Sequence, residues 1–272
     1  MSQKIKIGVV GCAGRMGQIL IGSILDQDKA QLSGGTERQD SPHMGQAIRH
    51  PVTGIETGLM VTDDAEALFK NSDAVLDFTC PTATVRHSSF AATHGTAHII
   101  GTTGMTADEE AALEKAAKSV AVVYASNFSL GVNLLFYLTR QAARLLDEDF
   151  DIEILEMHHR HKVDAPSGTA LGLGKEAAKG RQVDLDHVSD RGRDGVTGER
   201  QRGHIGFAVL RGGNVAGEHT VSFNGDDERI ELTHKAGDRA IFARGAVKAA
   251  LWAAVQGAGL YDMCDVLGLP RV

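Results

Sequence analysis

The first 126 residues alternate short apolar runs with helical patterns, and this alternation restricts the fold more than any other feature of the chain. Within each run, β-branched and apolar residues occupy consecutive positions rather than every second one. Such runs are typical of parallel strands that helices cover on both faces. The expected strands span residues 5–11, 32–37, 74–79, 97–102 and 120–126, and the expected helices span 16–25, 83–94 and 107–118. The alternation predicts a doubly wound parallel sheet with right-handed crossovers.

After Asn127 the pattern changes to longer helices and to strands that look antiparallel, with Asn224-Gly225 as a strong turn signal. The expected helices span about 130–146, 169–179 and 240–257, and the expected strands span 151–158, 205–210, 218–223 and 229–234. The fold class is therefore α/β: an N-terminal Rossmann-like sheet plus a smaller α+β domain with a mixed or antiparallel sheet. We expect a dinucleotide-binding domain of residues 1–129 and 240–272, and a substrate-binding and oligomerisation domain of residues 130–239.

The composition limits the partners that the chain can have. Its formal net charge of -7 speaks against general nucleic-acid binding, which needs a basic face. The most apolar long stretch is interrupted by Arg244, Lys248 and Gln256, and the N-terminus has no signal-peptide layout. Three dispersed cysteines suit a reducing compartment. We therefore expect a cytoplasmic protein without a nucleic-acid or membrane partner.

Gly11, Gly14 and Gly17 follow the first expected strand and open the first expected helix. This order places backbone N–H groups and a helix dipole against a pyrophosphate. The Gly-x-x-Gly-x-x-Gly spacing departs from the usual Gly-x-Gly-x-x-Gly fingerprint, but its position after the first strand supports the assignment. The alternative is a turn that only packs the helix against the strand.

Glu37 and Arg38 end the second expected strand, where an acidic residue usually binds the adenosine ribose. Glu37 suits the two ribose hydroxyls of NADH, whereas Arg38 suits the 2′-phosphate of NADPH. The pair predicts that either nucleotide is accepted. Both residues are also compatible with ordinary exposed charges at a strand end.

Two further loops each follow an apolar strand, Gly101–Gly104 and Ala125–Phe128. Ligands of such sheets bind beyond the carboxyl ends of the strands. The hydroxyl and amide side chains in these loops can hydrogen-bond a nicotinamide carboxamide.

Five consecutive residues that can carry positive charge extend from His158 to Lys162 and precede Ser167-Gly168-Thr169, which opens a helix. Titratable cations beside a helix N-terminus suit a small, multiply anionic substrate that must also be protonated. The alternative is a solvated surface run, but the apolar strand directly before the cluster argues against it.

With the glycine turn, Gly-Thr-Thr-Gly, Ala-Ser-Asn-Phe-Ser-Leu-Gly-Val-Asn and Glu-x-His-His-x-x-Lys-x-Asp-Ala-Pro-Ser-Gly-Thr-Ala in order, the chain resembles the 4-hydroxy-tetrahydrodipicolinate (dihydrodipicolinate) reductase family. The resemblance covers the chain from about Ile5 to the C-terminus. It implies reduction by NADH or NADPH of a cyclic dicarboxylate, 4-hydroxy-tetrahydrodipicolinate, with loss of water, in the diaminopimelate route to lysine. It also implies a homotetramer built through the sheet of the second domain.

The resemblance assigns roles to individual residues. It implies that His158 and Lys162 are catalytic and that His159, Gly168, Thr169 and Arg239 bind the substrate. The cofactor positions that it implies are Gly11, Cys12, Ala13, Gly14, Arg15, Met16, Glu37, Arg38, Gly101, Thr102, Thr103, Ala125, Ser126, Asn127 and Phe128. Ser126 stands where many members carry proline.

Three other interpretations remain open. A zinc site at His158, His159 and His161 needs a further ligand, and no spacing indicates one; we expect no metal. A non-catalytic NAD(P)-binding sensor explains the glycine turn but not the position of the cation cluster. A related amino-acid or semialdehyde dehydrogenase would need a reactive cysteine, and nothing in the sequence activates Cys12 or Cys80.

Overall fold

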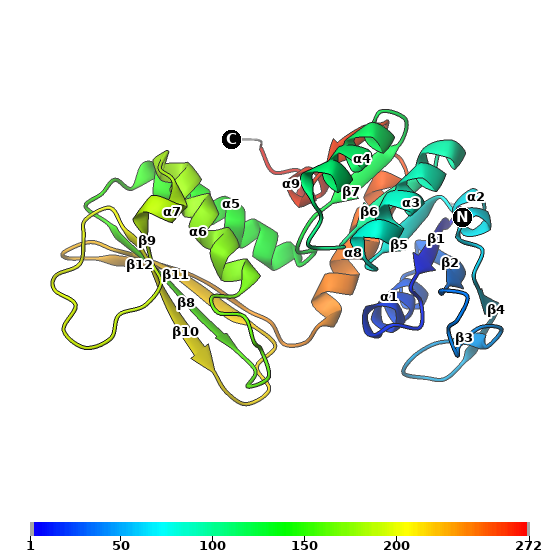
Figure 1. Ribbon diagram of the computed structural model, residues 1–272, viewed down its shortest axis with the longest axis horizontal. Coiled ribbons are helices and arrows are strands. Elements are labelled where there is room, and N and C mark those ends of the chain that lie inside the picture. The colour runs from blue at the N-terminus through cyan, green and yellow to red at the C-terminus, as the bar shows by residue number, and fades with distance from the viewer. Residues whose placement is uncertain (1–2, 271–272) are drawn as a thin grey trace. The chain divides into compact units, whose positions relative to one another are not determined.

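The computed structural model describes residues 3–270 of the 272-residue chain. Its contacts divide the chain into a first unit, Met1–Leu130 with Ala240–Val272, and a second unit, Gly131–Arg239 (Figure 1). The roles predicted for the two domains stay predictions at this level.

The first unit is built on one eight-stranded sheet in the order β13-β7-β6-β5-β1-β2-β4-β3. Its strands pair in parallel except for β3, which is antiparallel to β4. The strands are β1 (Ile5–Val10), β2 (Ala30–Thr36), β3 (Ala47–Arg49), β4 (Glu56–Thr62), β5 (Ala74–Asp77), β6 (Ala97–Ile100), β7 (Ala121–Tyr124) and β13 (Gly259–Tyr261). The predicted doubly wound sheet is confirmed.

The helices of the first unit are α1 (Arg15–Leu25), α2 (Ala65–Lys70), α3 (Pro81–His94), α4 (Ala107–Ala117), α8 (Ala240–Ala253) and α9 (Met263–Leu267). Fully buried Ile7, Val9, Leu20, Leu76 and Ile99 belong to one core cluster, which explains the uninterrupted apolar runs. Sequence patterns missed the short elements β3, α2, β13 and α9, and also the seven-residue strand β4, which is mostly exposed. The predicted final helix was too long: α8 ends at Ala253, and the chain continues into the edge strand β13.

The second unit carries a five-stranded mixed sheet in the order β12-β11-β8-β10-β9. Its elements are α5 (Leu130–Leu145), β8 (Asp151–His158), α6 (Gly168–Arg181), α7 (Leu185–Val188), β9 (Ser189–Asp190), β10 (Ile205–Arg211), β11 (Glu218–Asn224) and β12 (Arg229–Lys235). The apolar side chains of α5 and α6 bury one face of this sheet in a core that contains Ile152, Ile154, Leu173, Phe207 and Phe223.

The expectation of three antiparallel strands after residue 204 was wrong for β10. β8 lies between β10 and β11 and pairs in parallel with β10. The connection from β10 to β11 crosses the end of β8: His159 N–H donates to Val215 O at 2.8 Å, and Gly212 N–H donates to His158 O at 2.9 Å. Hydrogen bonds to β8 therefore replace the hairpin pairing that sequence proximity suggested.

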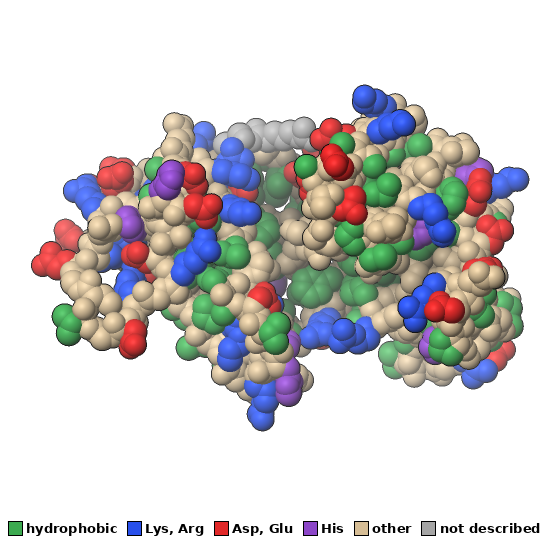
Figure 2. All heavy atoms as spheres, in the orientation of Figure 1, with side chains coloured by type: hydrophobic (Ala, Val, Ile, Leu, Met, Phe, Trp, Pro, Cys, Tyr) green, Lys and Arg blue, Asp and Glu red, His purple; other side chains and the backbone are tan. Residues whose placement is uncertain are grey.

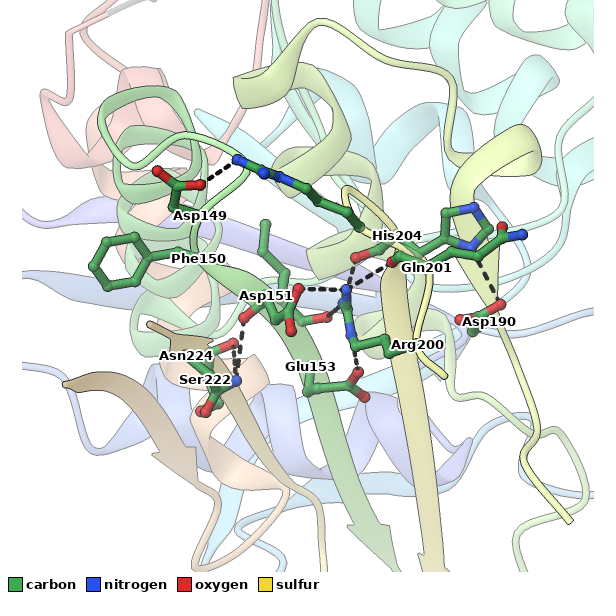
Figure 3. A network of polar contacts seen from close by, with 12 residues as sticks. Asp149, Phe150, Asp151, Glu153, Asp190, Arg200, Gln201, His204, Ser222 and Asn224 are labelled. Atoms are coloured by element: carbon green, nitrogen blue, oxygen red, sulfur yellow. Dashed lines mark hydrogen bonds and ion pairs between the residues drawn. The ribbon is translucent and has the colours of Figure 1, made fainter. Parts of the chain in front are cut away.

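Arg200 holds the polar segment before β10 in place through hydrogen bonds and ion pairs (Figure 3). Arg200 donates to Asp151 Oδ1 at 2.6 Å, to Glu153 Oε1 at 3.0 Å and to three backbone carbonyls. Gly206 leaves room for this network, because an added Cβ would lie 2.0 Å from Glu153 Oε2.

Charged side chains of both signs are interspersed over the visible face of each unit (Figure 2). Within residues 3–270, no helix combines the length and apolarity needed to cross a membrane.

Candidate active site

The glycine turn is held against the neighbouring strand by its own backbone. The N–H groups of Gly11 and Cys12 both donate to Thr36 O, at 2.8 and 3.1 Å. Gly11 has φ +68°, a conformation that favours glycine. An added Cβ on Gly17 would lie 2.2 Å from Gly11 O, so α1 can approach the turn this closely only with glycine there. The first turn of α1 follows Gly14, which supplies no side-chain cap. These features suit a pyrophosphate on the helix N-terminus.

Glu37 lies across this turn. Its Oε1 accepts a hydrogen bond from Ala13 N–H at 2.8 Å. Arg38 is exposed and pairs with Asp40 at 3.1 Å. The structure thus connects Glu37, which the sequence placed only at a strand end, directly to the glycine turn.

Cys12 is buried beneath the same turn, against Gly35. Burial and the nearby Glu37 carboxylate raise the pKa of its thiol to about 12. A neutral, buried thiol is a poor nucleophile. This argues against the dehydrogenase interpretation that uses Cys12.

The loops 101–104 and 125–128 lie beside aromatic rings at the carboxyl edge of the sheet. Gly101 packs on Phe78 so closely that an added Cβ would lie 2.1 Å from the ring, and the Phe78 and Phe128 ring centroids are 5.4 Å apart. Thr102 is buried, and its hydroxyl is 2.7 Å from that of Thr84. Thr103 and Ser126 are exposed.

A buried polar network lies behind these loops, and sequence analysis missed it. Asp77 is fully buried at the end of β5 and accepts from His87 Nδ1 at 2.7 Å, His98 Nε2 at 3.2 Å and Thr79 N–H at 3.1 Å. Burial alone would raise the pKa of Asp77, but the two histidines hold it far below its ordinary value. β1 and β5 are neighbours at the point where the strand order reverses, which is the usual ligand position in such sheets.

In the second unit, β8 ends at His158, so His159 and His161 lie in the turn after the strand. His158 is buried and donates from Nδ1 to Glu156 Oε2 at 2.6 Å. The Glu156 carboxylate also accepts two bonds from Arg211 and one from Ser167 N–H. Burial alone would raise the pKa of Glu156, but these hydrogen bonds lower it.

The remaining cations lie in the turn after His158. His159 Nε2 is 3.4 Å from an Arg239 guanidinium nitrogen, and the rings of His159 and His161 are 6.1 Å apart. Burial and the positive charges of Arg239 and His161 lower the pKa of His159. His159 therefore favours the neutral form, in which it is a hydrogen-bonding group rather than a cation. Lys162 pairs with Asp164 at 2.7 Å.

Helix α6 begins directly after this turn. Ser167 caps it by accepting from Ala170 N–H at 3.2 Å, and the Ser167 hydroxyl oxygen is 3.1 Å from His219 Nε2. An added Cβ on Gly168 would meet no atom within 4 Å, so the helix N-terminus is open to a ligand at this residue. Thr169 follows in the first turn and is half-buried.

The predicted residues thus form two groups. The glycine turn, Glu37 and the two loops lie at one edge of the first sheet, while Glu156 joins His158 to the start of α6 in the second unit. Within residues 3–270, no group of three or more His, Cys, Asp or Glu side chains is arranged to hold a metal ion. Besides the Asp77 network, sequence reasoning missed Glu156 and Arg211. The Glu at the start of the Glu-x-His-His pattern was a signal for Glu156.

A Rossmann-type sheet with a glycine turn, together with a second unit that carries histidine and lysine at a helix N-terminus, defines the class as a nicotinamide-dependent oxidoreductase. The model described as "Dihydrodipicolinate reductase, N-terminus" matches residues 5–128, and "Dihydrodipicolinate reductase, C-terminus" matches residues 131–267. The chain belongs to the dihydrodipicolinate reductase family. The resemblance drawn from its sequence motifs is confirmed.

Known proteins resemble the chain over nearly its whole length. The 4-hydroxy-tetrahydrodipicolinate reductase of Ruegeria sp. (strain TM1040) is 56% identical over 269 residues, which cover 99% of this chain and 100% of the relative. The 4-hydroxy-tetrahydrodipicolinate reductase 1 of Mesorhizobium japonicum is 55% identical and covers 96% of both chains. A dipicolinate-bound dihydrodipicolinate reductase from Paenisporosarcina sp. TG-14 has the same fold, with a TM-score of 0.78, 24% identity, and coverage of 97% of this chain and 99% of that chain.

Proposed function

We propose that the chain reduces (2S,4S)-4-hydroxy-2,3,4,5-tetrahydrodipicolinate to (S)-2,3,4,5-tetrahydrodipicolinate, with loss of water, in the diaminopimelate route to lysine. NADH or NADPH supplies the hydride when bound. The observation that carries the proposal is the fixed His158 beside the start of α6, in a chain whose other unit has the glycine turn. The dipicolinate found in the Paenisporosarcina reductase is a cyclic dicarboxylate of the same class as the proposed substrate.

The residues of the first unit hold the nucleotide. The glycine turn is shaped to let a pyrophosphate approach its backbone, and Glu37 and Arg38 contact the adenosine ribose or its phosphate. The loops 101–103 and 125–128 hold the nicotinamide end. Acceptance of both nucleotides follows from the adjacent acidic and basic residues.

The residues of the second unit bind and protonate the substrate. The backbone N–H groups of Gly168 and Thr169 receive a substrate carboxylate, and Arg239 contributes positive charge. Negative charge develops on the substrate as hydride arrives, so Lys162 stabilises that charge and donates a proton. His158 serves as a second acid–base group through Nε2, because Nδ1 is engaged by Glu156.

The test is oxidation of NADH and NADPH followed optically, with the substrate generated in place from pyruvate and aspartate semialdehyde by the preceding synthase. Turnover that depends on the synthase supports the reaction. No turnover by a folded protein that still binds the nucleotide would favour a non-catalytic sensor instead.

We also propose that the second unit's sheet forms a homotetramer interface. Leu155 on β8 and Leu210 on β10 are each more than 40% exposed and lie on the sheet face opposite to the buried Ile154 and Phe207. Light scattering of the wild type and of Leu155→Glu tests this proposal. A monomeric wild type would overturn it.

A further inference from the structure

The carboxylate of Glu156 lies at the centre of the second unit's polar groups and has not yet been assigned a role. Glu156 is 1% exposed and accepts four hydrogen bonds. The donors are Arg211 Nη1 at 2.8 Å, Arg211 Nη2 at 2.9 Å, His158 Nδ1 at 2.6 Å and Ser167 N–H at 2.9 Å. A carboxylate in this position connects the end of β8 to the start of α6.

The hydrogen bond to Glu156 decides which nitrogen of His158 carries the proton. An ionised carboxylate only accepts, so Nδ1 of His158 must be the N–H nitrogen. Nε2 is then the nitrogen that can exchange a proton with a substrate. Gly217, with φ +153°, lies beside this nitrogen: an added Cβ there would lie only 3.0 Å from Nε2, so the absence of a side chain keeps Nε2 uncrowded.

The surrounding groups hold this arrangement in place. Arg211 donates hydrogen bonds to both oxygens of Glu156 and to Asp164 O, the last at 2.6 Å. The same arginine therefore connects the 159–166 turn to the carboxylate. A bidentate guanidinium fixes the plane of a carboxylate as well as its position. His219 packs edge-on against the His158 ring, with centroids 5.1 Å apart at 74°.

We propose that Glu156 is a positioning residue for the reductase: it fixes His158 as the Nδ1–H tautomer with Nε2 directed to the substrate, and Arg211 holds Glu156 in place. The proposal rests on the proposed function for its consequence in catalysis, but the tautomer itself does not depend on any substrate. Because Arg211 compensates the charge of Glu156, the carboxylate serves His158 mainly as a hydrogen-bond acceptor of fixed direction.

The first test measures the tautomer in the nucleotide-free, full-length protein labelled with ¹⁵N-histidine. The imidazole nitrogen shifts distinguish N–H from bare nitrogen, and loss of one signal set in His158→Gln assigns His158. We expect Nδ1–H in the wild type. In Glu156→Gln the side-chain amide can donate to Nδ1, so the proton moves to Nε2. The matched control is Glu153→Gln, a strand neighbour that binds Arg193 and Arg200 and leaves the tautomer unchanged.

The second test compares kinetics in the synthase-coupled assay. We expect kcat of Glu156→Gln to fall about 100-fold, at the lower end of what a positioned acid–base group contributes, with KM for the nucleotide unchanged. Arg211→Lys, which retains the charge but not the bidentate pair of hydrogen bonds, should give an intermediate loss of kcat. If Glu156→Gln folds poorly, the tautomer of His158 in Arg211→Lys tests the proposal instead.

The outcomes separate the two proposals. An inactive wild type with the Nδ1–H tautomer would overturn the proposed function and leave the tautomer assignment standing. An Nε2–H tautomer in the wild type would overturn the positioning role of Glu156. So would an active wild type together with folded Glu156→Gln and Arg211→Lys variants whose kcat is unchanged.

Discussion

Glu37 accepts a hydrogen bond from the backbone N–H of Ala13, 24 residues earlier in the chain, at 2.8 Å. The bond joins the end of β2 to the glycine turn and holds a negative charge at the place where the ribose of a dinucleotide is expected. Arg38, directly after it, is exposed and pairs only with a surface aspartate at 3.1 Å among the described contacts. In the proposed cofactor site, Glu37 is therefore held by a hydrogen bond to the glycine turn, whereas Arg38 is exposed.

We expect Glu37→Ala to shift the preference toward NADPH. A carboxylate near a phosphate costs about 1–4 kcal/mol at 4 Å, depending on exposure, so the ratio of kcat/KM for NADPH over NADH should rise about fivefold or more. Arg38→Ala should move the ratio in the opposite direction. Steady-state kinetics with both nucleotides measure these changes, and an unaltered ratio in Glu37→Ala contradicts the ribose assignment.

Lys162→Ala should lose turnover while keeping its nucleotide affinity. Removal of a positioned proton donor lowers kcat by about 10²- to 10⁴-fold, whereas the proposed nucleotide site consists of other residues. Nucleotide titration by fluorescence and the coupled assay measure the two effects. Lys179→Ala is the control, because Lys179 is an exposed lysine that pairs with Glu176 on α6. Unchanged turnover would remove Lys162 from the mechanism.

Gly17→Ala should destabilise the protein and weaken nucleotide binding together. The new methyl group would lie 2.2 Å from Gly11 O, so the backbone must move, and such overpacking costs about 1–3 kcal/mol. Urea denaturation measures the free energy of unfolding. Gly14→Ala is the comparison, since its Cβ would be 3.3 Å from the same oxygen; an equal loss in both variants would contradict the explanation.

The stability of the protein should fall as the pH falls below about 6.5, in part because of His219. Burial and the nearby His158 lower the pKa of His219 to about 4, whereas an unfolded histidine has a pKa of about 6.5. Between these values the unfolded chain binds a proton that the folded chain does not, so the free energy of unfolding rises with pH. From pH 7 to pH 5 the loss at this site should be on the order of 1–2 kcal/mol.

Urea denaturation at both pH values checks this contribution in variants. His219→Gln should reduce the pH dependence, while His187→Gln, at an exposed position, should leave it as in the wild type. An unchanged pH dependence in His219→Gln would show that the folded protein protonates His219 as readily as the unfolded chain does.

Arg200→Met should loosen the segment before β10 (Figure 3). Arg200 is largely covered and serves two carboxylates, but Asp151 and Glu153 are partly exposed. The loss of stability should therefore be smaller than the loss of about 3–5 kcal/mol that follows removal of one partner from a buried pair. Arg202→Met is the control, because Arg202 and Asp149 are both exposed and such pairs contribute about 0–1 kcal/mol. Hydrogen exchange across residues 191–204 should quicken in the first variant only.

The sequence by itself determined the family and five strands of the first unit's sheet, namely β1, β2, β5, β6 and β7. Residues 120–123, Val-Ala-Val-Val, are apolar at every position, and all four are buried. A strand has this property when it is covered on both faces, so the pattern indicates a buried parallel strand. The motif from Glu156 to Thr169 is equally local, and its order together with the glycine turn and the two loop motifs carried the resemblance. Short elements such as α2 and β13 were missed because six or three residues give too little periodicity.

The tertiary structure alone decided which distant residues meet. No local pattern shows that Arg211, 55 residues after Glu156, binds both its oxygens, or that Glu37 reaches Ala13. The strand order also had to come from the structure, because β8 enters between β10 and β11 and takes the pairing that chain proximity had suggested. These contacts join segments far apart in the chain, and their positions are fixed by packing of whole strands and helices, which no short stretch of sequence contains.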